Sequence, residues 1–245
     1  MRVRVLHDYE ALSLAAAEEV AETLRSRPDA VLLLPTGTTP LGMYRRLAEM
    51  HRRAGLSFAR ATFFNLDEYL GLPPDHVASY RAYMHRNFYS LVDADPRRIH
   101  CPNGAAPDPE AECERYEAEI RRCGGADLCV LGIGRNGHIG FNEPGAPFGS
   151  RTRIVRLAES TRRVNARDFE EGRVPEHAIT VGMATIFESR RILLLASGAS
   201  KARAVAAAIE GDISESVPAS LLRRHPDAAF LLDGEAAAGL ARPSA

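Results

Sequence analysis

The segment from Gly132 to Gly145, GIGRNGHIGFNEPG, brings together side chains that could do acid–base chemistry. It follows an apolar run and places Asn136, His138 and Glu143 within eight residues. A histidine with a carboxylate five residues away could form an oriented acid–base pair, because the carboxylate fixes the imidazole tautomer and raises its pKa. The alternative is that these side chains only tie the loop together through structural hydrogen bonds.

The same segment begins with G-x-G-x-x-G, the pattern of a dinucleotide-binding turn. Such a turn needs a helix that opens at its third glycine, since the pyrophosphate binds at that helix's N-terminus. The residues after Gly137 contain too much glycine and proline to continue as a regular helix. We therefore predict no nucleotide here and expect the glycines to let the backbone approach another ligand closely.

Two further segments could bind an anion. LPTGTTPLGMYRRL runs from a predicted strand into a predicted helix, where hydroxyl and N–H groups would face a phosphate. It lacks the G-K-[ST] ending of a nucleotide P-loop, and plain threonine capping of the helix is the alternative. SGASKARAV places Lys201 in the first turn of another helix, where it opposes the helix dipole, so that either a bound phosphate or solvent must compensate it.

A candidate general base lies in FNLDEYLGL. Asp67 and Glu68 follow a predicted strand and are flanked by phenylalanine, leucine and tyrosine. Such an apolar collar would partly desolvate a carboxylate and raise its pKa toward the range useful for a base. The alternative is an exposed Asp-Glu pair without a chemical role.

The elements that must position these residues are short apolar runs alternating with helical patterns. This alternation predicts an α/β fold, with a mostly parallel, Rossmann-like sheet covered by helices on both faces. The candidate strands cover 3–6, 31–35, 61–65, 127–133, 178–181, 191–196 and 228–233, and the candidate helices lie near 12–24, 40–53, 79–90, 109–122 and 199–210. No repeat or linker interrupts the pattern, so we expect one domain over residues 1–245.

The composition points to a small-molecule partner. The formal net charge of −1, with 45% hydrophobic and 26% charged residues, indicates neither a nucleic-acid-binding nor a membrane-surface protein. No run is long enough to span a membrane and the N-terminus has no apolar signal region, so we expect a cytoplasmic protein. The four cysteines form no C-x-x-C pair and are expected to be reduced thiols.

Taken together, these segments resemble the glucosamine-6-phosphate deaminase family, also called glucosamine-6-phosphate isomerases. LPTGTTPLGMY, FNLDEYLGL, SYRAYMHRNFY, GIGRNGHIGFNEPG, SRTRIVRL, AITVGMATI and SGASKARAV occur in the family's order and spacing over nearly the whole chain. The resemblance implies a metal-independent enzyme without a cofactor. Its reaction, in amino-sugar catabolism, converts glucosamine 6-phosphate and water to fructose 6-phosphate and ammonia.

The resemblance also implies roles for individual residues. Asp67 matches the base that moves a proton from C2 to C1, His138 the group that helps to open the pyranose ring, and Glu143 its supporting carboxylate. Asn136 stands where some members have aspartate, and its amide can only orient His138 or a substrate hydroxyl, because it relays no proton. The family's phosphate-binding pattern falls on Thr36, Gly37, Thr38, Thr39, Arg167 and Lys201.

Two other functions remain as alternatives. One is a 6-phosphogluconolactonase-like sugar-phosphate hydrolase, although the Ile-Gly-Phe-Asn-Glu sequence after His138 and the Asn-Leu-Asp-Glu-Tyr segment favour the deaminase. The other is a non-catalytic sugar-phosphate sensor, against which the joint presence of Asp67, His138 and Glu143 argues.

Regulation and assembly are the remaining expectations. Hexameric members of the family are activated by N-acetylglucosamine 6-phosphate through an Arg-x-Lys segment, which here reads Arg153-Ile154-Val155. We therefore expect weak or absent activation by that ligand. A homo-oligomer is possible, and either the gluco or the galacto epimer could be the preferred substrate.

Overall fold

Seven parallel strands form the central sheet of the computed structural model, which describes residues 1–166, 169 and 173–241. In sheet order they are β1 (Arg2–Leu6), β10 (Ala228–Asp233), β9 (Arg191–Ala196), β6 (Leu128–Gly132), β2 (Val31–Leu34), β3 (Thr62–Asn65) and β5 (Ile99–His100). Every neighbouring pair is parallel. The central strands are apolar at nearly every position because both faces of the sheet are covered.

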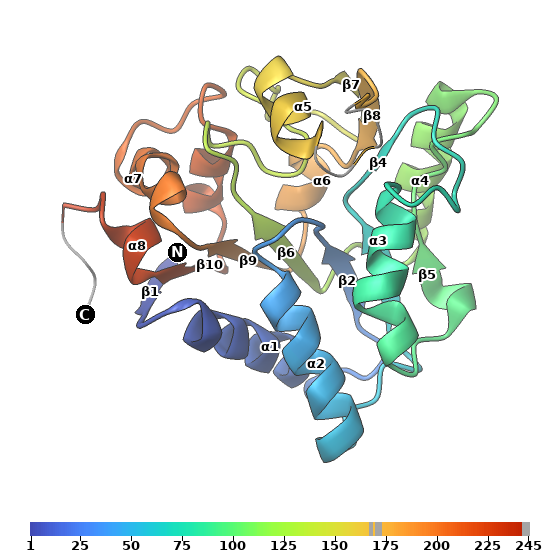
Figure 1. Ribbon diagram of the computed structural model, residues 1–245, viewed down its shortest axis with the longest axis horizontal. Helices are drawn as coiled ribbons and strands as arrows, with labels where there is room; N and C mark the ends of the chain where they lie inside the picture. Colours follow the sequence, from blue (N-terminus) through green and yellow to red (C-terminus); the bar gives the residue numbers. More distant parts are fainter. Residues whose placement is uncertain (167–168, 170–172, 242–245) are drawn as a thin grey trace.

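Helices cover the two faces of the sheet (Figure 1). The side chains of the central strands alternate between the two faces. One face carries α1 (Tyr9–Ser26), α2 (Leu41–Ala54) and α3 (Tyr80–Asn87); the other carries α4 (Pro109–Arg122), α6 (Met183–Phe187), α7 (Ala202–Glu210) and α8 (Gly234–Ala237). In β2, Leu32 and Leu34 pack toward the first group of helices and Leu33 toward the second. The described residues also form the short 3-10 helices η1 (Tyr89–Leu91), η2 (Pro96–Arg98), η5 (Ala199–Lys201) and η6 (Pro218–Arg224).

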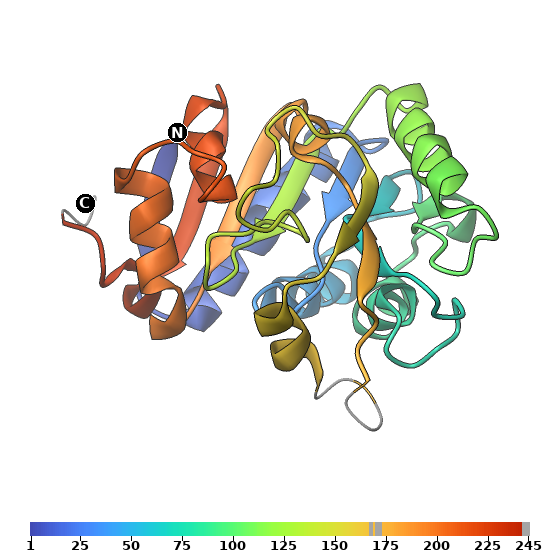
Figure 2. The same ribbon diagram turned by 90° about the horizontal axis from the view of Figure 1, so that it is seen from above.

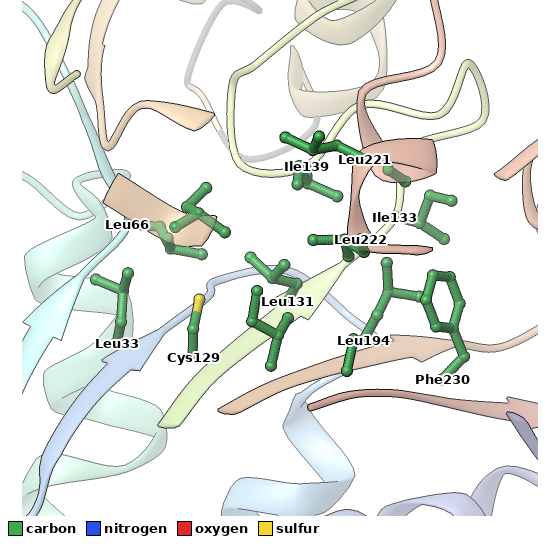
Figure 3. Close-up of a cluster of buried hydrophobic side chains, with 14 of the residues drawn as sticks. Leu33, Leu66, Cys129, Leu131, Ile133, Ile139, Leu194, Leu221, Leu222 and Phe230 are labelled. Carbon is green, nitrogen blue, oxygen red and sulfur yellow. The ribbon is translucent and has the colours of Figure 1, made fainter. Parts of the chain in front are cut away.

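The apolar core on the α6 and α7 side also anchors the loop that follows β6. Figure 3 shows Ile133 and Ile139 on the same side of the sheet as Leu131 and Leu194. Both isoleucines are fully or almost fully buried, and Leu222 of η6 belongs to the same cluster. The two isoleucines thus fix the start and middle of the Gly132–Gly145 loop, and the side chains of Arg135, Asn136 and His138 between them line the cleft described below.

A second, three-stranded antiparallel sheet corrects one expectation. The segment predicted as a strand of the main sheet, 178–181, forms β8 (His177–Thr180), which lies between β4 (Asp67–Tyr69) and β7 (Arg153–Arg156). Its buried, apolar pattern is the same in either sheet, so periodicity alone does not reveal the partner strands. In the view of Figure 2, this sheet and α5 (Glu159–Asn165) project from the main sheet.

The predicted α/β architecture, with a mostly parallel sheet and helices on both faces, is confirmed. The predicted helix over 79–90 ends earlier, at Asn87, and continues as η1. All four cysteines are unpaired, and Cys113 and Cys129 are buried. Among the described residues, no helix combines the length and apolar character that crossing a membrane requires.

Candidate active site

The loops that follow β2, β3, β6 and β9 meet at one cleft of about 350 Å³. These strands are neighbours in the sheet, so their carboxyl ends lie along one edge, where α/β proteins bind ligands. Of the residues predicted from the sequence, eight line the cleft: Thr36, Gly37, Thr38, Thr39, Asp67, Asn136, His138 and Lys201. Glu143 stands behind His138, and Arg167 lies outside the described residues.

The loop after β2 is built as an anion cradle. Its carbonyl groups are held by two tyrosines: the hydroxyl of Tyr83 donates to Gly37 O at 2.5 Å, and that of Tyr9 lies 3.1 Å from the carbonyl oxygens of both Thr38 and Thr39. In the part of the chain that the structure describes, the N–H groups of residues 36–39 donate to no protein acceptor. Orphaned donors at the start of a helix, here α2, favour an anion.

Lys201 enters the cleft from the opposite side. Its ammonium donates to the carbonyl oxygen of Ile133 at 2.6 Å, and burial, together with the nearby charge of Arg135, lowers its pKa. The preceding residues do not add to an anion site, because the N–H groups of Gly198 and Ala199 already donate to the carboxylates of Asp233 and Glu235. In this segment, therefore, it is the lysine that faces the cleft.

Asp67 is buried, with 6% of its surface exposed, and burial raises its pKa to about 6. Its Oδ1 accepts hydrogen bonds from the hydroxyl of Thr180 and, at 3.2 Å, from the N–H of Phe141, and both bonds partly oppose this rise. Within the described residues, its Oδ2 accepts no hydrogen bond. A carboxylate with one oxygen held by hydrogen bonds, the other oxygen open, and a pKa close to neutrality has the properties of a general base.

Glu68 has a different and structural environment. Its carboxylate is buried and accepts hydrogen bonds from the N–H groups of Tyr69, Tyr80 and Arg81, each at 2.9 Å. Two of these donors belong to the first turn of α3, so Glu68 satisfies orphan groups of that helix. The alternative of an exposed Asp-Glu pair is wrong, since both carboxylates are buried.

His138 and Glu143 form the predicted pair. The His138 Nδ1 lies 3.3 Å from Glu143 Oε2, although the alignment is not that of a full hydrogen bond. Burial disfavours the charge on Glu143, but His138, Thr161 and Asn136 outweigh it and lower its pKa to about 2. An ionised carboxylate beside one ring nitrogen orients the imidazole and stabilises its protonated form.

The side-chain amide of Asn136 forms a hydrogen bond with each residue of this pair. Its Nδ2 donates to Glu143 Oε2 at 2.7 Å, and its Oδ1 accepts from the backbone N–H of His138 at 3.3 Å. Through Glu143 it helps to orient the His138 side chain. Asn136 also lines the cleft, so a contact with a substrate hydroxyl stays a prediction.

Two glycines of the loop are needed for close packing of this acid–base group. A Cβ on Gly134 would lie within 2.5 Å of three atoms of the His138 ring. Gly140 has a φ of +56°, and a Cβ there would lie 3.1 Å from Asp67 Oδ1. Glycine therefore lets the backbone of one loop touch both the imidazole and the candidate base. Residues 133–152, all of which the structure describes, form no helix, as their glycine and proline content predicts.

Sequence reasoning missed three residues of this region. Thr180 reaches Asp67 from β8, and the hydroxyl of Thr161 on α5 donates to Glu143 Oε1. Arg135 lines the cleft next to Asn136. The two threonines lie far from their partners in sequence, and only the antiparallel pairing of β4 with β8 brings Thr180 to Asp67. Arg135 lies within GIGRNGHIGFNEPG, and its positive charge next to Asn136 was the feature from which a role in the site could have been predicted.

The donor set of the cleft suits an anionic organic ligand rather than a metal ion. The described residues contain no group of three or more His, Cys, Asp or Glu side chains arranged to hold a metal. The cleft is instead lined by a cradle of N–H groups, a lysine, a buried carboxylate and an imidazole. Such a site can bind a phosphate while moving protons on the carbon skeleton attached to it.

Comparison with known proteins agrees with this chemistry. A family model described as glucosamine-6-phosphate isomerases/6-phosphogluconolactonase matches residues 7–231. The glucosamine-6-phosphate deaminase of Bacillus velezensis is 51% identical over 240 residues, which cover 98% of this chain and 100% of the relative. A solved structure of a monomeric glucosamine-6-phosphate deaminase has a TM-score of 0.96 at 51% identity, covering 98% of this chain and 100% of that chain.

A more distant solved structure, the 6-phosphogluconolactonase from Trypanosoma brucei, shares the fold, with a TM-score of 0.79 and 22% identity over 98% of both chains. The motifs of the cleft had already favoured the deaminases over this group. Because the family model spans most of the chain and a deaminase matches nearly all of it at 51% identity, the chain belongs to the family of glucosamine-6-phosphate isomerases and 6-phosphogluconolactonases, and its predicted resemblance to the deaminases is confirmed.

Proposed function

We propose that this protein converts glucosamine 6-phosphate and water to fructose 6-phosphate and ammonia, with Asp67 as the base and the His138–Glu143 pair opening the sugar ring. The observation that carries the proposal is that a buried carboxylate with a raised pKa and a carboxylate-supported imidazole line the same cleft as an anion cradle. The proposed reaction uses all three, as a base, a ring-opening group and a phosphate site.

The ring-opening step uses the imidazole. Opening a cyclic amino sugar moves a proton from the C1 hydroxyl to the ring oxygen, so that the C1–O5 bond breaks and an aldehyde forms. His138 can carry that proton because Glu143 stays ionised beside it and balances a positive charge on the ring. Thr161 and Asn136 each hold an oxygen of Glu143, which keeps the carboxylate in place during the transfer.

The isomerisation step uses the carboxylate. In the open-chain aldehyde the C2 proton is acidic; Asp67 removes it while a proton passes from the substrate's ammonium group to the C1 oxygen, which gives an enolamine, and Asp67 then returns its proton to C1. The resulting iminium carbon at C2 adds water, and loss of ammonia leaves the ketone of fructose 6-phosphate. Burial helps, because a carboxylate with a pKa of about 6 takes up and releases a proton more evenly near neutral pH than an exposed one does.

The phosphate does not react and serves as a handle. The N–H groups of residues 36–39 and the ammonium of Lys201 would bind it, together with Arg167 if that residue follows the family pattern. Binding energy from a remote group can hold C1 and C2 beside Asp67, which lowers the barrier by positioning. No metal is needed for either proton transfer.

Among the alternatives, lactone hydrolysis fits the cleft less well. It requires attack of water on a carbonyl and gives no role to a second, buried base such as Asp67. A sensor without turnover would gain nothing from Asp67, because burial makes the ionisation of this carboxyl unfavourable.

We further infer that one chain forms a complete catalytic unit, because a glucosamine-6-phosphate deaminase of known structure that is 51% identical to this chain is monomeric. A homo-oligomer would then have to form elsewhere on the surface. Light scattering coupled to size-exclusion chromatography tests this, with 26.7 kDa as the mass of one chain.

A location in the cytoplasm, where sugar phosphates occur, is also part of the proposal.

The test of function is the release of ammonia and fructose 6-phosphate from glucosamine 6-phosphate by purified protein without added metal, beside Asp67→Asn. Equal amounts of both products, lost in the variant, support the proposal. Turnover of 6-phosphogluconolactone instead would replace it with the lactonase, and binding of glucosamine 6-phosphate without turnover would replace it with the sensor.

A further inference from the structure

Arg135 sits at the corner of a tight turn whose backbone is fixed. The N–H of Gly137 donates to Gly134 O at 3.1 Å, which makes Arg135 and Asn136 the two central residues of a four-residue turn. The N–H of Gly134 in turn donates to the carbonyl oxygen of His138 at 2.9 Å. The side chain of Arg135 therefore starts from a defined point on the rim, and it lines the cleft.

The guanidinium of Arg135 is exposed and has no partner of its own. Across the described ranges of the chain, no carboxylate pairs with it and no side-chain hydrogen bond engages it. Many other arginines do pair, such as Arg115 with Glu112 and Arg151 with Glu188. An arginine left unpaired beside a ligand cleft can turn to a ligand without breaking a bond inside the protein.

A second cation faces the same cleft. Lys201 also lacks a carboxylate partner among the described residues, since its ammonium donates to a backbone carbonyl. The two positive charges repel each other in the free protein, and this repulsion contributes to the lowered pKa of Lys201, after burial. Among the described residues, the other ionisable groups lining the cleft are Asp67, His138 and Tyr80, and burial holds the pKa of Tyr80 well above its usual value.

We propose that Arg135 is a phosphate-binding residue, which together with Lys201 places two positive charges against the two negative charges of the substrate's phosphate. This inference rests on the proposed function only in that the ligand carries a phosphate monoester. A guanidinium can bind two phosphate oxygens at once, whereas an ammonium acts as a point charge, so the two side chains complement each other. Binding of the dianion also removes the repulsion between them.

The test compares Arg135→Gln and Arg135→Lys with the natural protein. Arg60→Gln is the matched control, because Arg60 is exposed, has no partner among the described residues, and precedes β3 at the end remote from the cleft. We expect Arg135→Gln to raise KM for glucosamine 6-phosphate about tenfold, the lower end for a charge-assisted hydrogen bond since the arginine is exposed. The value of kcat should change less than about twofold, because the phosphate does not react.

Binding of inorganic phosphate, measured by calorimetry, gives a readout that does not depend on turnover. It should weaken about tenfold in Arg135→Gln, less in Arg135→Lys, and not at all in Arg60→Gln. Unchanged KM and phosphate affinity in Arg135→Gln would overturn the inference, and so would an equal loss in Arg60→Gln, which would indicate a general charge effect. If the protein proves not to be a deaminase but phosphate affinity still falls in Arg135→Gln alone, the proposed function fails while this inference stands.

Discussion

Removing the charge of Asp67 should stabilise the fold at neutral pH while abolishing catalysis. Burial raises the pKa of this carboxyl from 3.8 to about 6, so its ionised form is less favourable in the folded than in the unfolded chain. Below pH 3.8 the group is protonated in both states and contributes nothing; above pH 6 it is ionised in both, and the folded state is destabilised by about 3 kcal/mol. Stability is therefore lost as pH rises through this window.

Asp67→Asn removes the titration and keeps the shape. We measure the difference in the free energy of unfolding between the variant and the natural protein. This difference should increase by about 2 kcal/mol from about pH 4.5 to 7.5, because most of the total effect of about 3 kcal/mol develops in this range. The amide can still accept from Thr180 and Phe141, and any constant difference in packing shifts all points equally. The slope with pH, rather than the value at one pH, therefore carries the test.

The assay is urea unfolding at a series of pH values for the natural protein, Asp67→Asn and Asp212→Asn. Asp212 is exposed, so its substitution should leave a difference that does not vary with pH. A flat difference for Asp67→Asn, or one that grows in favour of the natural protein, would refute the argument that burial dominates at this carboxyl. The activity of the natural protein should fall on the acid side with an apparent pKa near 6, because the base must be ionised.

Three more results are expected. Thr180→Val removes a hydrogen bond that favours the ionised form of Asp67, so the acid limb of the kcat/KM profile should move up by about one pH unit. Thr180→Ser keeps the hydroxyl and should leave the limb in place. Equal shifts in the two variants would argue against a role of the hydroxyl. Glu143→Gln should lower kcat about 100-fold at every pH from 5 to 9, because a carboxyl with a pKa of about 2 is ionised throughout this range. A loss confined to one end of the range would contradict a permanently ionised carboxylate. Dialysis against EDTA should leave kcat and KM unchanged, and recovery of lost activity by a divalent cation would refute metal independence.

Much of the site could be predicted because its parts follow individual strands in sequence. The β2, β3, β6 and β9 segments were recognisable from their apolar runs, and the polar residues directly after them had to meet at the carboxyl edge of a parallel sheet. The apolar neighbours of Asp67 correctly indicated burial. For these features, local sequence and the rules of α/β topology were sufficient.

The rest depended on contacts between distant segments. That Glu68 satisfies the start of α3 while Asp67 faces the cleft follows from the alternation of β4, a strand of three residues that composition does not reveal. Thr180 became a partner of the base only because β8 joins the small antiparallel sheet instead of the main one. The carboxylates that accept from the N–H groups at the start of η5 could not be foreseen either, since Asp233 lies at the end of a different strand.

The loop after β6 explains how one short segment can serve both ends of the reaction. Arg135 stands at its first corner, on the side of Lys201, while His138 and the N–H of Phe141 contact the acid–base groups a few residues later. Ile133 and Ile139, buried in the core, anchor the start and middle of this stretch. In the proposed mechanism the loop therefore sets the spacing between the bound phosphate and the reacting carbons, and positioning of this kind turns phosphate binding energy into rate.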